Sequence, residues 1–300
     1  MIADRFVDLY ARNSGLRDKL IAERDVVLTY ALRALVETGV MGHLAFKGGT
    51  CLRKLVFGSV SRFSEDLDFT IDSADADDDV LVRVVETFNQ EHFGIRFAFD
   101  EYYKTDDDTS FGGDALYRHS WNDAGRFRLQ VSLRERPTLP ATARPMQYQA
   151  YFDRLEFPAF EVRALDTVEM IAEKVRAAFQ RTKVRDLHDL YRFATRPFDG
   201  ELLRSLVVLK LWQVRDPFVP HAFFDRLRST RYDWADLARL LRIADRIEPE
   251  ELISTVEARF EMLRYPTELE LELVADARRG RAHALAERLR QEIRLRAGPG

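Results

Sequence analysis

The chain has 300 residues, of which 46% are hydrophobic, 11% aromatic and 32% charged, and its formal net charge is −4. This composition supplies a sizeable core and excludes general disorder, while the near-neutral charge argues against non-specific nucleic-acid binding. No apolar run approaches the roughly 20 residues of a membrane-spanning helix, so we expect no membrane insertion. The single cysteine, Cys51, excludes an intrachain disulfide and a zinc cluster and favours a cytoplasmic protein.

The two halves of the sequence differ in charge and in predicted secondary structure. Residues 1–160 contain 20 basic and 26 acidic side chains, whereas residues 161–300 contain 26 and 24. Apolar periodicity predicts, in chain order, a helix over 16–38, a strand over 43–46, a helix over 51–57, a strand over 66–71, a helix over 79–91 and strands over 95–103, 115–121 and 126–134. A polar loop is expected over 105–113, and prolines at 137, 140 and 145 indicate a long irregular connection.

After residue 160 the apolar pattern becomes helical throughout. Helices are predicted over 166–182, 185–195, 200–214, 234–246, 250–263, 267–278 and 281–296. We therefore expect an α+β domain with a mixed sheet over 1–160, followed by an all-helical domain over 161–300.

The strongest candidate for a functional site lies between residues 46 and 71. The run Lys47-Gly48-Gly49-Thr50 precedes a predicted helix, where backbone N–H groups and the helix dipole favour an anion. Asp66 and Asp68 occupy alternate positions of the next predicted strand, so both carboxylates project from one face. Two such carboxylates repel each other unless a cation separates them, and Mg²⁺ prefers one or two carboxylates together with substrate phosphates.

Each part of this pattern also has a purely structural interpretation. A Gly-Gly pair before a helix is common, and alternate aspartates on a strand often mark only a solvated edge. Ser64 either caps backbone amides or contacts a phosphate. The combination of all these features within one short segment favours a magnesium-dependent phosphate site.

The segment KGGT…SEDLDF resembles the first motif of the DNA-polymerase-β-type nucleotidyltransferases, in the form found in the AbiEii toxin family. That family also places a lysine on a later helix, followed by two aspartates three residues apart. The matching positions are Lys174 in MIAEKVRAAFQR, then Asp186 and Asp189 in VRDLHDLYRF. The resemblance spans about residues 25–195 and implies a nucleotidyltransferase-like α+β fold.

The resemblance also implies a role for each matching residue. Asp66 and Asp68 would hold Mg²⁺, and the residues expected to bind the NTP phosphates are Lys47, Gly48, Gly49, Thr50, Ser64 and Lys174. Asp186 and Asp189 would orient Lys174 or the sugar and base of the nucleotide. Without the resemblance, Lys174 would be interpreted as a surface residue and Asp186 as a helix cap, and His188 is expected to be packed or solvated.

One position departs from the family pattern. Nucleotidyltransferases of this type commonly have a third metal-binding carboxylate on a neighbouring strand, but the position that aligns here is Gln130. A glutamine offers a carbonyl oxygen but no charge. Either Glu135 or another acid replaces it, or only one metal ion binds tightly.

The implied activity is transfer of a nucleotidyl group from an NTP to an acceptor hydroxyl, with release of pyrophosphate. The resemblance further implies a toxin of a type IV toxin–antitoxin (abortive infection) system, with tRNA as the acceptor in several members and a cognate antitoxin as partner. Two alternatives remain open at this point. One is an NTP-dependent transferase that modifies a protein, and the other is a catalytically degenerate interaction protein.

The C-terminal segment is rich in arginine. Seven arginines lie between 278 and 296, against only Glu287 and Glu292. The spacing of Leu285, Leu289 and Ile293 predicts the apolar face that docks this helix, which would leave most of the arginines facing outward. If RNA is the acceptor, we expect Arg288, Arg290 and Arg294 to contact its phosphates; the alternative is a solvated terminal helix.

Overall fold

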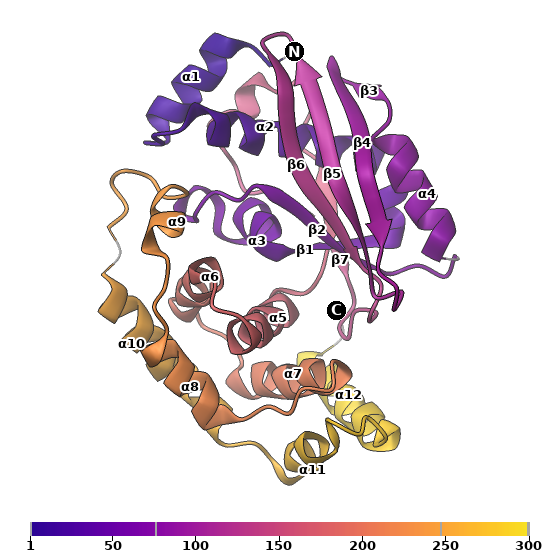
Figure 1. Ribbon diagram of the computed structural model, residues 1–300, viewed down its shortest axis with the longest axis vertical. Coiled ribbons are helices and arrows are strands. Elements are labelled where there is room, and N and C mark those ends of the chain that lie inside the picture. Colours follow the sequence, from indigo (N-terminus) through magenta and orange to yellow (C-terminus); the bar gives the residue numbers. More distant parts are fainter. Residues whose placement is uncertain (1, 76, 247, 299–300) are drawn as a thin grey trace. The chain divides into compact units, whose positions relative to one another are not determined.

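The computed structural model describes residues 2–75, 77–246 and 248–298, and Figure 1 shows the path of the chain. The chain divides into two compact units. The first comprises residues 1–137, 141–165 and 238–245, and the second comprises residues 138–140, 166–237 and 246–300. None of the described helices combines the length and the apolar character needed to span a bilayer.

The first unit contains one mixed sheet. In the described residues it has eight strands in the order β3-β4-β5-β6-β2-β1-β8-β7. Their bounds are Leu44–Lys47 for β1, Asp66–Ile71 for β2, Glu91–His92 for β3, Ile95–Lys104 for β4, Ser110–His119 for β5, Asn122–Ser132 for β6, Thr142–Pro145 for β7 and Glu161–Ala164 for β8. β2 pairs antiparallel with β1 and parallel with β6, β1 pairs parallel with β8, and the other neighbours are antiparallel.

One face of strands β4, β5 and β6 forms part of the core. Their side chains alternate between buried and exposed positions, as expected for strands with one covered face. The ring of Phe88, one residue beyond α4, packs against Phe97, Phe99 and Phe127 on that face, with ring centroids 5.5, 6.3 and 5.8 Å apart. The helices of this unit are α1 Asp4–Asn13, α2 Lys19–Glu37, α3 Gly48–Cys51 and α4 Asp77–Thr87, and a π-helical segment, Leu52–Phe57, continues α3.

The second unit is helical, as the sequence predicts. Its helices are α5 Thr167–Gln180, α6 Val184–Ala194, α7 Gly200–Gln213, α8 Pro220–Ser229, α9 Trp234–Ala238, α10 Pro249–Arg259, α11 Glu268–Asp276 and α12 His283–Ala297. Asp166 and Asp199 cap the first turns of α5 and α7 through their side chains, and Thr267 and Glu270 form a capping box at the start of α11. Together with the sheet of the first unit, these helices confirm the expected α+β fold class.

The predicted helix over 234–246 is wrong beyond Ala238. Backbone groups that a helix would use internally bond to other segments of the first unit instead. Leu240 O accepts from the backbone N–H of Phe63 at 2.8 Å, and the N–H of Ile243 donates to Gly15 O at 2.8 Å. Although its leucines are spaced as in a helix, the backbone of this segment therefore forms tertiary hydrogen bonds instead of helical ones.

Other differences concern short elements. The loop predicted over 105–113 ends earlier, because β5 already begins at Ser110. Its two glycines, Gly112 and Gly113, reduce strand propensity, but β4 lies so close that a Cβ at Gly113 would be 2.9 Å from Tyr102 Cα. The sequence patterns also did not predict α1, α8, β7 and β8, and β7 ends in a proline at the edge of the sheet.

Candidate active site

The Lys47-Gly48-Gly49-Thr50 turn joins β1 to the following helix. Gly48 has a φ of +81°, a conformation that glycine adopts without steric cost. A Cβ at Gly49 would lie 2.4 Å from Nη2 of Arg62 and 3.0 Å from Oγ of Ser64. The backbone conformation at Gly48 therefore favours glycine, and the backbone of Gly49 lies close to Arg62 and Ser64, which are themselves buried.

Asp66 and Asp68 lie at the start of β2, both half-buried, with their side chains on the same face of the sheet. Asp68 contacts the glycine turn directly, since a Cβ at Gly48 would be only 2.2 Å from its Oδ2 atom. The Thr50 hydroxyl donates a 2.5 Å hydrogen bond to the backbone oxygen of Asp66. The glycine turn and the two aspartates therefore lie side by side. The hydrogen bond of Thr50 connects the helix after the turn to β2.

Gln130, the residue aligned in the sequence analysis with the third acid of the family pattern, lies on β6. Its Cα pairs with that of Asp68 across the parallel β2–β6 ladder, so the two side chains share a face. The Gln130 side-chain amide donates to Oγ of Ser110 at 2.9 Å.

Among the described residues, no group of three or more His, Cys, Asp or Glu side chains is placed to hold a metal ion. Of the two alternatives stated for Gln130, this favours a single tightly bound ion over replacement by Glu135 or another acid. Two carboxylates beside the glycine turn still fit one Mg²⁺, because this ion is commonly bound by one or two carboxylates plus substrate phosphates and water. The donor set thus suits a single ion shared with a bound triphosphate.

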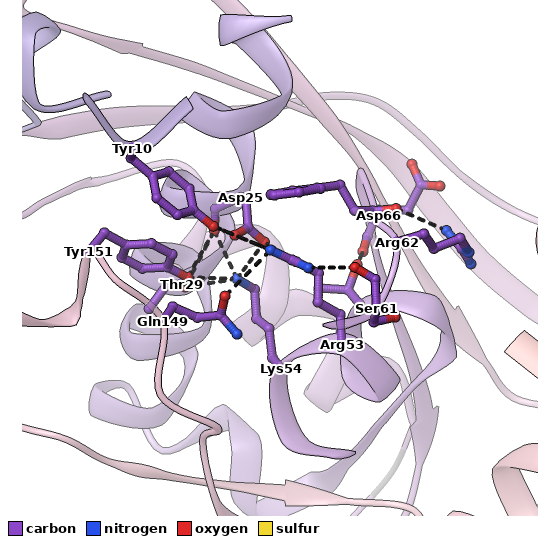
Figure 2. Close-up of polar contacts among 12 residues, drawn as sticks. Tyr10, Asp25, Thr29, Arg53, Lys54, Ser61, Arg62, Asp66, Gln149 and Tyr151 are labelled. Carbon is purple, nitrogen blue, oxygen red and sulfur yellow. Dashed lines mark hydrogen bonds and ion pairs between the residues drawn. The ribbon is translucent and has the colours of Figure 1, made fainter. Parts of the chain in front are cut away.

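A buried network of charged and polar groups fixes the helix that follows the turn (Figure 2). Asp25 on α2 accepts hydrogen bonds from Arg53 Nε at 3.1 Å, from Lys54 Nζ at 3.0 Å and from the Tyr10 hydroxyl at 2.7 Å. Lys54 also donates to the Tyr151 hydroxyl at 3.0 Å. The side chains of Asp25, Arg53 and Lys54 are at most 1% exposed.

The electrostatics of this network follow from its burial. Burial by itself would raise the pKa of Asp25, but the charges of Arg53 and Lys54 outweigh this effect and hold its pKa well below the usual range. Burial lowers the pKa of Lys54, although Asp25 opposes the shift. The cluster therefore holds two basic side chains, both from the segment after the glycine turn, around one carboxylate. Sequence analysis did not single out these residues; the available signal was an Arg-Lys pair within the otherwise apolar run CLRKLVF.

The second unit brings together the other three predicted residues. Lys174 on α5 forms ion pairs with Asp186 at 3.0 Å and with Asp189 at 2.9 Å, both on α6. The Lys174 side chain is 12% exposed, whereas the two aspartates are at most 2% exposed. Asp186 also accepts a 2.7 Å hydrogen bond from Arg181. The interpretation of Lys174 as a surface residue is therefore wrong, and so is that of Asp186 as the cap of α6, whose N-cap residue is Lys183.

The partners of Asp186 keep it ionised. Burial by itself would raise the pKa of Asp186. The Lys174 ammonium and the Arg181 guanidinium lower it by more than burial raises it, so the pKa lies below its ordinary value. His188 lies between the two aspartates in the sequence and is buried, as expected for a packed residue.

The C-terminal helix is docked as predicted, but its arginines are engaged. Leu289 and Ile293 are buried and Leu285 is half-buried. Arg288 pairs with Glu292 and Arg290 with Glu287, while Arg294 donates to the backbone oxygen of Thr138. Each of these three arginines therefore has a partner within the chain, and its contact with RNA phosphates stays a prediction.

Known proteins resemble this chain in sequence and in structure. A family model described as "Nucleotidyl transferase AbiEii toxin, Type IV TA system" matches residues 30–220. The nucleotidyltransferase toxin MenT4 of Mycobacterium tuberculosis has a similar structure, with a TM-score of 0.81 and 25% sequence identity over 98% of this chain and 100% of that one. A Helicobacter pylori protein, JHP933, is 20% identical over 88% of this chain and 97% of its own, with a TM-score of 0.47. No curated protein sequence gives a significant match.

Proposed function

Because the chain belongs to the AbiEii family of nucleotidyltransferase toxins of type IV toxin–antitoxin systems, we propose that it adds a nucleotide to RNA, with tRNA as its acceptor. An RNA hydroxyl attacks the α-phosphorus of an NTP. The bond to the β-phosphate oxygen breaks, and the products are RNA extended by a nucleoside monophosphate, pyrophosphate and a proton. NTP and tRNA occur together in the cytoplasm, which is where we place the reaction.

The observation that carries this proposal is the direct contact between Asp68 and Gly48. It supports the proposal because a carboxylate lies against a turn that presents backbone N–H groups, and a metal-bridged triphosphate needs both. We assign Asp66 and Asp68 as the ligands of Mg²⁺. When bound, Mg²⁺ neutralises charge on the triphosphate and stabilises the attacking and leaving oxygens.

The residues of the turn bind the triphosphate in this proposal. The backbone N–H groups of Gly48, Gly49 and Thr50 hold phosphate oxygens, and Lys47 adds a positive charge. Ser64, whose Oγ would be 3.0 Å from a Cβ at Gly49, lies where it can donate to the same anion. The buried Asp25–Arg53–Lys54 network keeps the helix in place, so the N–H groups are oriented before substrate arrives.

Lys174 neutralises the β- and γ-phosphates, where negative charge grows as pyrophosphate leaves. A lysine ammonium suits this task as a compact point charge. Its ion pairs with Asp186 and Asp189 hold the side chain in one orientation. The two aspartates are therefore positioning residues for Lys174. A cognate antitoxin, which the type IV classification implies, is the expected protein partner.

The experiment incubates purified protein and Mg²⁺ with each of the four α-³²P-labelled NTPs, total tRNA and total cell protein. The proposal predicts label in the RNA fraction and release of unlabelled pyrophosphate. Label in the protein fraction alone would contradict RNA as acceptor and support a protein-modifying transferase. A γ-labelled NTP is the control, because nucleotidyl transfer leaves no γ-label on the acceptor.

A further inference from the structure

Strands β4, β5 and β6 leave one face open, and this face continues from the carboxylates of β2. Asp66 pairs in register with Arg128 of β6, which pairs with Asp114 of β5, which pairs with Asp100 of β4. Residues paired in this way project from the same face of a sheet. The open face therefore extends from Asp66 across three further strands, about 14 Å at the usual strand spacing.

The open face carries an excess of arginine. Its exposed positions include Arg96 on β4, Arg118 on β5, and Arg126 and Arg128 on β6, against the two acids Asp100 and Asp114. Arg96 and Arg118 lie directly opposite each other across the β4–β5 ladder, an unfavourable arrangement for like charges, and Arg96 forms an ion pair with Glu91 of β3 at 3.4 Å. Among the described residues, no carboxylate forms an ion pair with Arg118 or Arg126.

An exposed tyrosine lies at the end of this face nearest the carboxylates. Tyr103 is 39% exposed and pairs with Gly112, where a Cβ would be 3.3 Å from its hydroxyl oxygen. Arg128 donates a 2.5 Å hydrogen bond to that hydroxyl. Gly112 thus leaves room for the ring to lie against β5, and Arg128 fixes the ring beside the position of Asp66.

We propose that the open face of β4, β5 and β6 binds the acceptor RNA. Arg118 and Arg126 contact its phosphates, and Tyr103 stacks on a base close to the reacting end. Arginines interleaved with an exposed aromatic ring on an open sheet are the features that single-stranded RNA requires, since phosphates and base faces are what it presents. The inference rests on the proposed function, because it assumes that the acceptor reaches Asp66 and Asp68.

The test measures binding of fluorescently labelled total tRNA across a salt series, without NTP. We compare wild type, Arg118→Gln/Arg126→Gln and the matched control Arg17→Gln/Arg154→Gln. The control removes two exposed arginines of the same unit that have no described side-chain partner. Because each double variant replaces two arginines, both change the net charge equally. We expect the first variant to bind about tenfold more weakly, with the slope of log K against log salt reduced by about 1.5. The control should match wild type.

Equal affinities of the two double variants would overturn the inference, as would wild-type protein that does not bind tRNA. Tyr103→Ala tests the stacking part, and we expect about tenfold weaker binding with an unchanged salt slope. Because no nucleotide is transferred in this assay, its result is independent of the activity test. Protein that binds tRNA on this face but labels only protein would refute the proposed function and retain the RNA surface. If the protein labels tRNA but both double variants bind tRNA equally well, the proposed function is retained and the RNA surface on this face is refuted.

Discussion

A Cβ on Gly48 would lie 2.2 Å from the Oδ2 atom of Asp68 and 2.9 Å from its Cβ. No side chain fits into that space. Asp68 can therefore keep its position only while residue 48 is a glycine. This contact joins the two halves of the motif, the turn suited to phosphate and the strand that carries the carboxylates.

Replacing Gly48 by alanine tests this contact. The new methyl group must displace Asp68, and the φ of +81° is strained for any residue with a side chain. We expect the free energy of unfolding to fall by about 1–2 kcal/mol and transferase activity by about a hundredfold. Gly42→Ala is the control, because a Cβ there has no neighbour within 4 Å. Wild-type activity in Gly48→Ala would show that the position of Asp68 is not critical.

Lys174→Ala should abolish most nucleotide binding and turnover, with turnover reduced by at least about a hundredfold. Lys183→Ala, at the start of α6, should be nearly silent because that side chain is exposed. Removing Lys174 also leaves Asp186 and Asp189 without its ammonium group, so some loss of stability is expected. NTP affinity is therefore measured well below the unfolding temperature of each variant. Equal effects of the two substitutions would refute the role of Lys174.

The buried network makes a prediction about stability. Asp25→Asn leaves Arg53 and Lys54 in the core without their carboxylate, and we expect the free energy of unfolding to fall by about 3–5 kcal/mol. Adding Lys54→Met restores the net charge of the wild-type cluster and should recover part of the loss. Chemical denaturation of the four members of this double-mutant cycle measures the coupling. Strictly additive effects would mean that Asp25 and Lys54 do not act together.

The pH dependence of Asp186 has a definite sign. Its pKa is lowered in the folded protein from an ordinary value of 3.8, so the unfolded chain takes up this proton at a higher pH than the folded chain. The stability that Asp186 contributes is therefore present above about pH 4 and is lost as the pH falls through the folded-state pKa. The stability difference between wild type and Asp186→Asn should be constant near neutral pH and shrink below pH 4. A difference that stays constant down to pH 2.5 would contradict the assignment.

The sequence predicted the local parts of the site better than the contacts that support it. Gly48, Gly49, Asp66 and Asp68 lie within a short segment, and turn chemistry and strand alternation suffice to place them. The pairing of Lys174 with Asp186 came from family resemblance, since helical periodicity does not show which helices pack together.

Contacts between distant segments could not be predicted. Asp25 contacts Arg53 and Lys54, which are 28 and 29 residues away in the sequence, and helical periodicity does not reveal such a partner. For the same reason the helix over 234–246 was predicted too long. Its leucines fit a helical period, but Leu240 bonds to Phe63 instead. In both cases tertiary contacts outweigh the local pattern.

The most direct test of the central claim is transfer of label from α-³²P-NTP to tRNA by Asp66→Asn and Asp68→Asn, at saturating Mg²⁺. Each substitution keeps the shape of the side chain but removes a charge that Mg²⁺ binding requires. Asp123→Asn, an exposed change on the same sheet, is the control, and thermal unfolding verifies that all three variants are folded. The account predicts that each site variant loses activity by about two to three orders of magnitude while Asp123→Asn stays active. Wild-type turnover in folded Asp68→Asn would contradict it.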